Sequence, residues 1–168
     1  MSAHLPESVD AWRMVSARRS YAGSMAIAGL GRLTGLLASA AGTVEYQLDF
    51  GRDELGSAYL ALQAKARVQL LCQRTLEPFG STLVVQQHLG LIKDESEEAA
   101  LPPGYEPLLV DGPLRLADVI EDELLLAVPL VPVAPGSEAA LTPWQERSEA
   151  PEVEVPHPFA QLKTLKQD

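Results

Sequence analysis

Four carboxylate side chains lie within six residues of this chain, and carboxylates at close range can do chemistry. Asp118, Glu121, Asp122 and Glu123 could hold Mg²⁺, or could act as a general acid and a general base. On a helix, however, Asp118 and Asp122 share a face while the other two point elsewhere, so the four groups do not converge. We therefore expect an acidic surface that faces solvent or a basic partner, and no metal site.

Other residue types that carry catalysis are sparse. Cys72 is the one cysteine of the chain, which excludes an internal disulfide and an all-thiolate zinc site. Its inward parity on a predicted strand favours a buried structural thiol over a nucleophile. His4, His88 and His157 lie far apart in the sequence. We therefore predict no cofactor and a protein that is not an enzyme.

A small basic surface is the second feature of the sequence that could have a chemical function, namely the binding of phosphate groups. Lys65 and Arg67 fall on the outward parity of one predicted strand, and Arg74 could extend the same side. Together with Arg32, they are candidates for contact with RNA phosphates. An ordinary solvated strand face is the simpler interpretation. Tyr59 is the only aromatic residue expected beside this strip, which does not support a stacking platform for single-stranded RNA.

Segments with period-two alternation must position these residues. Residues 43–50, 58–72 and 81–92 are predicted strands, each with one apolar and one polar face. Their short links predict an antiparallel meander with one solvated face, in an α+β fold. A helix over about residues 24–39, begun by Ser24 as its N-cap, is predicted to cover the other face. The apolar positions of this helix are Ile27, Leu30, Leu33 and Leu37.

The C-terminal half contains a second amphipathic segment. Residues 116–128 are predicted to form an acidic helix with an apolar stripe, which Pro129 ends. Residues 108–110 could pair as a short strand before it. Residues 1–133 are therefore predicted to form one globular domain.

The last part of the chain has a different composition. Residues 134–157 are rich in Ala, Pro and Glu and are predicted to be a flexible acidic linker. Residues 158–168 are predicted to form a short docking segment. Phe159, Leu162 and Leu165 repeat there at every third position, and they would contact either their own domain or a partner.

The net charge of −10 argues against a general, charge-driven binder of nucleic acid or of an anionic membrane. Residues 1–42 carry four basic and two acidic residues, residues 43–92 four and five, and residues 93–168 five and sixteen. The acidic half suits a basic partner. Arg32 and three glycines interrupt the apolar stretch at residues 25–41, so we predict that it is neither a secretion signal nor a membrane span. We therefore predict a cytoplasmic protein.

Several motifs, taken together, resemble one bacterial family over about residues 10–166. They are Cys72–Phe79, Tyr105–Pro107, Val119–Pro129, and Pro158–Ala160 before Leu165 and Lys166, with Tyr21–Gly23 and Arg32–Leu33 near the N-terminus. This set resembles the YceD family, also called the large ribosomal RNA subunit accumulation protein.

The chain departs from the family pattern at three positions. Thr75 stands where many relatives carry a second cysteine, and Ala134 where some carry a histidine with another cysteine beyond it. Arg115 replaces a common capping aspartate. Because only Cys72 remains of the possible metal or redox residues, the resemblance implies no metal here.

The resemblance implies a cytoplasmic, non-enzymatic factor that supports the synthesis, processing or stability of 23S ribosomal RNA. We expect it to hold a basic ribosomal protein or an rRNA-processing factor with its acidic half. Direct binding of large-subunit rRNA through the local basic face is the alternative. A Mg²⁺-dependent nuclease built on the carboxylates of residues 118–123 is the least favoured hypothesis.

Overall fold

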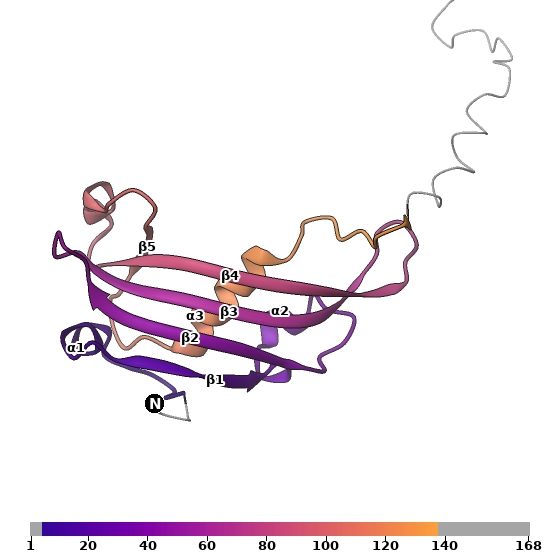
Figure 1. Ribbon diagram of the computed structural model, residues 1–168, viewed down its shortest axis with the longest axis horizontal. Coiled ribbons are helices and arrows are strands. Elements are labelled where there is room, and N and C mark those ends of the chain that lie inside the picture. The colour runs from indigo at the N-terminus through magenta and orange to yellow at the C-terminus, as the bar shows by residue number, and fades with distance from the viewer. Residues whose placement is uncertain (1–4, 138–168) are drawn as a thin grey trace, which may run out of the picture. The chain divides into compact units, whose positions relative to one another are not determined.

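The computed structural model describes residues 5–137, and its first compact unit ends at Ala134. This unit is built on one five-stranded sheet with the strand order β1-β2-β3-β4-β5 (Figure 1). Strands β1 to β4 pair antiparallel, and β5 pairs parallel to β4. The strands are β1 (Ser20–Ala26), β2 (Thr43–Arg52), β3 (Ala58–Leu71), β4 (Pro78–Ile92) and β5 (Glu106–Leu109). The helical elements are α1 (Ala11–Ser16), η1 (Ile27–Gly29), α2 (Gly31–Thr34), η2 (Glu95–Ala100) and α3 (Leu116–Ala127).

The predicted antiparallel meander is confirmed as strands β2, β3 and β4. Leu48 of β2 lies opposite Leu62 of β3, so the inward residues of adjacent strands meet across the sheet. Every residue predicted to point inward is buried, because each strand follows its period-two pattern. These residues are Val44, Tyr46, Leu48, Phe50, Leu60, Leu62, Ala64, Ala66, Val68, Leu70, Cys72, Leu83, Val85, Leu89 and Leu91.

One face of the sheet carries the hydrophobic core and the helices. α1 contacts β2 and β3, and α3 contacts β3 and β4. In Figure 1, α3 crosses the sheet obliquely. Ile120 and Leu124 of α3 are fully buried in the same cluster as Leu60 and Leu62 of β3. Burying one such side chain contributes about 1.5–3 kcal/mol. The polar side chains of β2, β3 and β4 line the other, open face of the sheet.

The predicted helix over residues 24–39 is wrong. The chain forms strand β1 up to Ala26, then the 3₁₀ turn η1 and the one-turn helix α2. Ser24 lies in β1 opposite Glu45 of β2, so it caps no helix. The glycines of this segment each cost a helix about 1 kcal/mol, whereas pairing with β2 satisfies the backbone of β1.

The covering role predicted for this segment is nevertheless retained. Ile27, Leu30 and Leu33 are fully buried in the core, and Leu37 is partly buried against it. The apolar spacing therefore identified the buried residues correctly, although it reflects a turn and a one-turn helix rather than a continuous helix.

The acidic helix predicted over residues 116–128 is confirmed as α3, and the short strand predicted over residues 108–110 is confirmed as β5. The acidic surface predicted for α3 needs one correction. Two of its four carboxylates, Glu121 and Glu123, do not face solvent, because both side chains are buried. The reasons lie in α2 and in β4, which pack against this helix.

The linker and docking segment predicted beyond Ala134 fall almost wholly outside the described residues. Phe159, Leu162 and Leu165 belong to that part of the chain. Within residues 5–137, no helix is long and apolar enough to cross a membrane.

Candidate functional site

Glu121 of α3 receives its hydrogen bonds from α2, which lies far away in the sequence. Its Oε1 accepts from the backbone N–H of Arg32 at 2.7 Å and from that of Leu33 at 3.0 Å. Its Oε2 accepts from Nε of Arg32 at 3.1 Å. The amides of a first helical turn have no partner within the helix. Glu121 therefore caps α2 across a sequence separation of 89 residues.

Arg32, a predicted RNA contact, has its charge paired within the fold. Its guanidinium lies 3.0 Å from the carboxylate of Glu121 and also contacts Asp122. Asp122 first, and then Glu121, raise the pKa of Arg32. Burial alone would raise the pKa of Glu121, but the amides of Leu33 and Arg32 and the guanidinium hold that pKa below its ordinary value. Arg32 therefore joins α2 to α3.

The other carboxylates of α3 point in different directions. Asp118 lies 3.1 Å from Nε of Arg115, one turn earlier in the chain. Burial of Glu123, and then the charges of Glu106 and Asp122, raise the pKa of Glu123. Within residues 5–137, no group of three or more His, Cys, Asp or Glu side chains is placed to hold a metal ion. Contact of these carboxylates with a basic partner stays a prediction.

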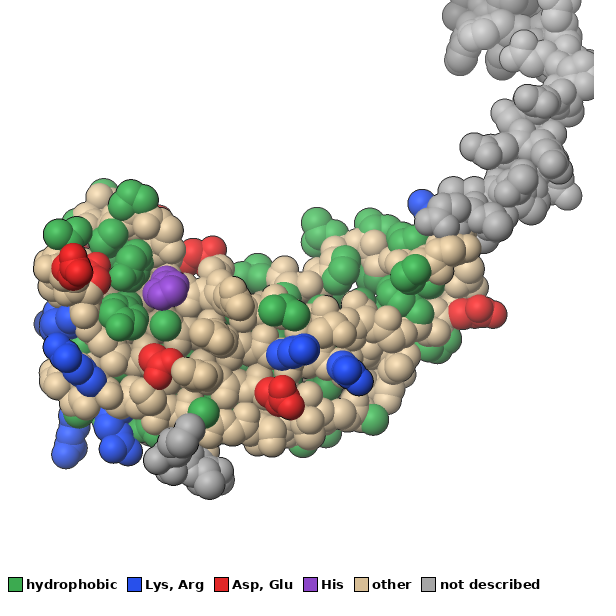
Figure 2. Space-filling view, viewed as in Figure 1, with side chains coloured by type: hydrophobic (Ala, Val, Ile, Leu, Met, Phe, Trp, Pro, Cys, Tyr) green, Lys and Arg blue, Asp and Glu red, His purple; other side chains and the backbone are tan. Residues whose placement is uncertain are grey.

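Lys65 and Arg67 lie on the open face of β3, as their parity predicts. Figure 2 views this face and shows basic side chains near its middle. Both residues are exposed. Gly42, Thr43 and Glu45 line a shallow hollow together with them.

The structure brings together two of the four predicted RNA contacts. Arg74 is exposed in the turn beyond the end of β3. Arg32 belongs to α2, on the covered side of the sheet with α3. The basic surface of the sheet is therefore a patch of Lys65 and Arg67, rather than a strip that Arg74 extends.

The expectation that Tyr59 is the only aromatic residue on the open face needs correction, because two further rings lie beside it. The ring of Tyr59 in β3 lies 6.2 Å from that of His88 in β4 and 6.4 Å from that of Tyr105, which precedes β5. The rings of His88 and Tyr105 lie 5.9 Å apart. The inward residues of β4 have odd numbers, so the even number of His88 predicts a side chain on the open face. Tyr105 had no such signal, because its position depends on the parallel pairing of β5 with β4.

Cys72 is fully buried at the end of β3, as predicted. Its Sγ accepts a hydrogen bond from the backbone N–H of Ala134 at 3.3 Å. This hydrogen bond, and then one from Thr75, lower the pKa of the thiol to about 6. The backbone N–H of Gln73 also donates to the carbonyl of Pro132 at 2.9 Å. The turn after β3 therefore holds the segment that follows α3.

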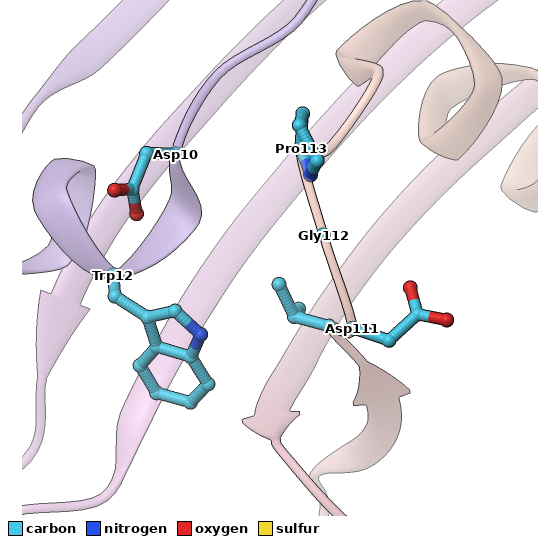
Figure 3. Close-up of a pocket in the computed structure, with 6 residues that line it drawn as sticks. Asp10, Trp12, Asp111, Gly112 and Pro113 are labelled. Atoms are coloured by element: carbon cyan, nitrogen blue, oxygen red, sulfur yellow. The ribbon is translucent and has the colours of Figure 1, made fainter.

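A separate hollow of about 310 Å³ opens between α1 and the segment after β5. The carboxylates of Asp10 and Asp111 at its edges point away from each other (Figure 3). Asp10 is engaged as the N-cap of α1, where it accepts from the backbone N–H of Arg13 at 3.0 Å. Lys93 Nζ lies 5.0 Å from the ring centre of Trp12. These groups do not converge on one point, so the hollow is not a candidate catalytic centre.

Comparison with known proteins gives a consistent result. Residues 60–166 match the family model described as "Large ribosomal RNA subunit accumulation protein YceD". A protein of the same name from Haemophilus influenzae is 32% identical to this chain over 97% of each sequence. No solved structure matches the chain significantly. The chain therefore belongs to the YceD family of large ribosomal RNA subunit accumulation proteins.

Proposed function

We propose that this chain supports accumulation of large-subunit ribosomal RNA as a non-enzymatic factor that contacts the RNA through the open face of the β3–β4 hairpin. The names of the family model and of the relative from Haemophilus influenzae describe rRNA accumulation and state no reaction. A factor that acts on ribosomal RNA in a bacterium works in the cytoplasm, as the sequence also predicts.

The observation that carries this proposal is the charge of the hairpin. Residues 58–92 contain Lys65, Arg67 and Arg74 but only one acidic residue, Glu77, so the hairpin is net +2 in a chain of net −10. An RNA backbone is attracted by local basic surface even where the whole protein is acidic. The hairpin is therefore the part of the sheet best suited to contact phosphate groups.

The geometry of the two central cations supports the same proposal. Lys65 and Arg67 are exposed, and neither forms an ion pair with another of the described residues. A phosphate that binds them need not break an existing salt bridge. A guanidinium can also hold a phosphate with two parallel hydrogen bonds, which an ammonium cannot do.

The test is binding of the full chain to transcribed fragments of large-subunit rRNA at low salt. We expect Lys65→Gln combined with Arg67→Gln to weaken binding about fivefold or more, because both phosphate contacts are lost. The matched control removes the same charge near α1, as Arg13→Gln with Arg18→Asn. Asn suits position 18 because the backbone φ there is 46°. Equal binding by the hairpin variant and the wild type would contradict direct RNA contact.

A second candidate function is contact with a basic ribosomal protein or an rRNA-processing factor. The observation in its favour is the exposed acidic residues at η2, which are Asp94, Glu95, Glu97 and Glu98. Clustered exposed carboxylates attract a basic partner and select its orientation. Asp118 and Asp122 of α3 and the segment with Phe159, Leu162 and Leu165 stay predicted contacts, whereas Glu121 and Glu123 are buried within the fold.

Purification of tagged protein at low salt distinguishes this second candidate. A basic protein that co-purifies with the wild type should be lost when Glu95, Glu97 and Glu98 are all changed to Gln, and retained when Lys65 and Arg67 are changed to Gln. Retention of that protein by the η2 variant would exclude η2 as its binding surface.

A further inference from the structure

We propose that Tyr59, His88 and Tyr105 form a base-stacking site, so that the open sheet face binds single-stranded RNA in preference to duplex RNA. This inference rests on the proposed function, because it assumes that the open face contacts RNA. It goes further by naming the form of RNA and the side chains that select it.

The three rings meet on the same side of the sheet as the basic patch. Tyr59, Lys65 and Arg67 all have outward parity on β3, and His88 has outward parity on β4. Tyr105 reaches the other two from the segment before β5, with ring centres 5.9–6.4 Å away. His88 is exposed and both tyrosines are half-buried. Aromatic faces that remain open to solvent can stack on unpaired bases.

Two glycines beside Tyr59 leave room for the side chains of this cluster. Gly51 of β2 and Gly90 of β4 lie opposite Tyr59 on its two sides. A Cβ on Gly51 would come within 2.6 Å of the ring of Tyr59, so the ring lies against the bare backbone of β2. A Cβ on Gly90 would come within 2.6 Å of Leu101, which comes from the loop that also carries Tyr105. Gly51 therefore accommodates the ring of Tyr59, and Gly90 accommodates the loop that carries Tyr105.

A row of glutamines separates the rings from the cations. Gln63 of β3 lies opposite Gln47 of β2 and opposite Gln86 of β4. Together with Lys65, these three side chains help to line a hollow of about 320 Å³ on the open face. Each amide offers both donors and acceptors, which suits the edges of unpaired bases.

The order along β3 is therefore aromatic, amide, cation. Tyr59 and Lys65 are six residues apart, which is about 20 Å along a strand. That length fits a run of several nucleotides rather than a single one.

Acidic residues near the open face disfavour some paths for the RNA, and one of them, Asp53, lies close to Tyr105. Glu45 of β2 lies opposite Lys65 and Asp49 lies further along the same strand, so phosphates are repelled from β2. Residues 58–71 and 78–92 contain no Asp or Glu. The RNA would thus follow β3 and β4. In a duplex the bases are already stacked and paired, so the rings have nothing to bind and only the phosphate contacts remain.

The experiment compares a labelled single-stranded oligoribonucleotide of about 12 nucleotides with the same strand annealed to its complement. Binding of the full chain is followed by fluorescence anisotropy. We expect the wild type to bind the single strand more tightly than the duplex. Tyr59→Leu should weaken single-strand binding about fivefold or more and leave duplex binding unchanged, whereas Tyr59→Phe retains the ring and should bind like the wild type.

The variants separate this inference from the proposed function. If Tyr59→Leu remains folded by circular dichroism and binds the single strand like the wild type, the proposal of a stacking site is wrong. Loss of binding in the Lys65 and Arg67 double variant would still support RNA contact in that case. A wild type that prefers the duplex would also overturn the stacking site, even if the leucine variant fails to fold. If the wild type binds neither RNA at low salt, the proposed function fails as well. If the open face binds an acidic peptide instead of RNA, that binding would depend on Lys65 and Arg67 but not on Tyr59.

Discussion

Glu121 connects two segments that are remote in sequence, and its single carboxylate meets two backbone amides and one guanidinium. Such a buried group stabilises the fold only while its partners are present. Removing the charge leaves the amides of Arg32 and Leu33 with a weaker acceptor, and the guanidinium with Asp122 alone.

The first prediction concerns this carboxylate. Glu121→Gln should lower the free energy of unfolding at pH 7 by about 1–3 kcal/mol, as measured by urea denaturation. Because the folded pKa lies below the ordinary value, the contribution is present above the unfolded pKa and is lost as pH falls through the folded pKa. The difference between variant and wild type should therefore shrink in acid. Asp118→Asn, in an exposed ion pair, is the control and should cost about 1 kcal/mol at most. Equal losses in the two variants would contradict the capping role.

The second prediction concerns the Cys72 thiol, whose pKa is lowered to about 6 by the amide of Ala134 and by Thr75. The thiolate is favoured in the folded state, so stability from this group is present above the ordinary thiol pKa and is lost as pH falls toward 6. Between those limits the free energy of unfolding of the wild type should decrease as the pH is lowered. The free energy of unfolding of Cys72→Ala should change less over the same range. Parallel pH profiles for the two proteins would show that Cys72 does not titrate in this range.

At the scale of elements, α3 uses its carboxylates in opposite ways. Glu121 is buried with partners and its pKa is lowered, whereas Glu123 is buried near Glu106 and Asp122 and its pKa is raised. One turn of helix thus contains a stabilising and a destabilising charge. The β3–β4 hairpin, against which α3 packs, is the basic element, and its cations lie on the opposite, open face of the sheet.

The third prediction follows from the raised pKa of Glu123. The folded state binds a proton more readily than the unfolded state, so the charge destabilises the fold above the folded pKa and the penalty disappears as pH falls. Glu123→Gln should therefore raise the free energy of unfolding at pH 8 by about 0.5–2 kcal/mol, with the gain lost in acid. A destabilised Gln variant at pH 8 would mean that the ionised carboxylate has a favourable partner. Urea denaturation at both pH values provides the measurement.

The sequence predicted the meander well because each strand has one wet and one dry face, which places Leu48, Leu62 and Val85 without any tertiary information. It failed at residues 24–39, because apolar spacing cannot distinguish a helix from a strand that leads into short turns. The cap on α2 depends on a carboxylate 89 residues away, so no local pattern could show it. Tyr105 could not be placed beside Tyr59 and His88, because its position depends on the parallel pairing of β5 with β4.

At the scale of the whole molecule, an acidic protein carries a limited basic surface. Only Lys65 and Arg67 of the predicted cations meet on the open face, so few counterions would be released when RNA binds. Binding should therefore be weakly salt-dependent and should rely on other contacts for its affinity.

The fourth prediction gives this a magnitude. If two phosphates are neutralised, the slope of log K against log salt should be about −1.4 for single-stranded RNA, which is about sevenfold between 50 and 200 mM salt. Titration at four salt concentrations measures the slope, and the Lys65 and Arg67 double variant should bring it close to zero. A slope steeper than about −3 would mean that further cations, such as Arg74, take part.

The link between α2 and α3 also determines when the protein can fold during its own synthesis. At about 5–20 residues per second, roughly 4 to 18 seconds pass between translation of Arg32 and translation of Glu121. During that interval Ile27, Leu30 and Leu33 lack the helix that completes their cover. Nascent chains that end before α3 should therefore leave these three side chains open to chaperones, although the whole meander has already been made.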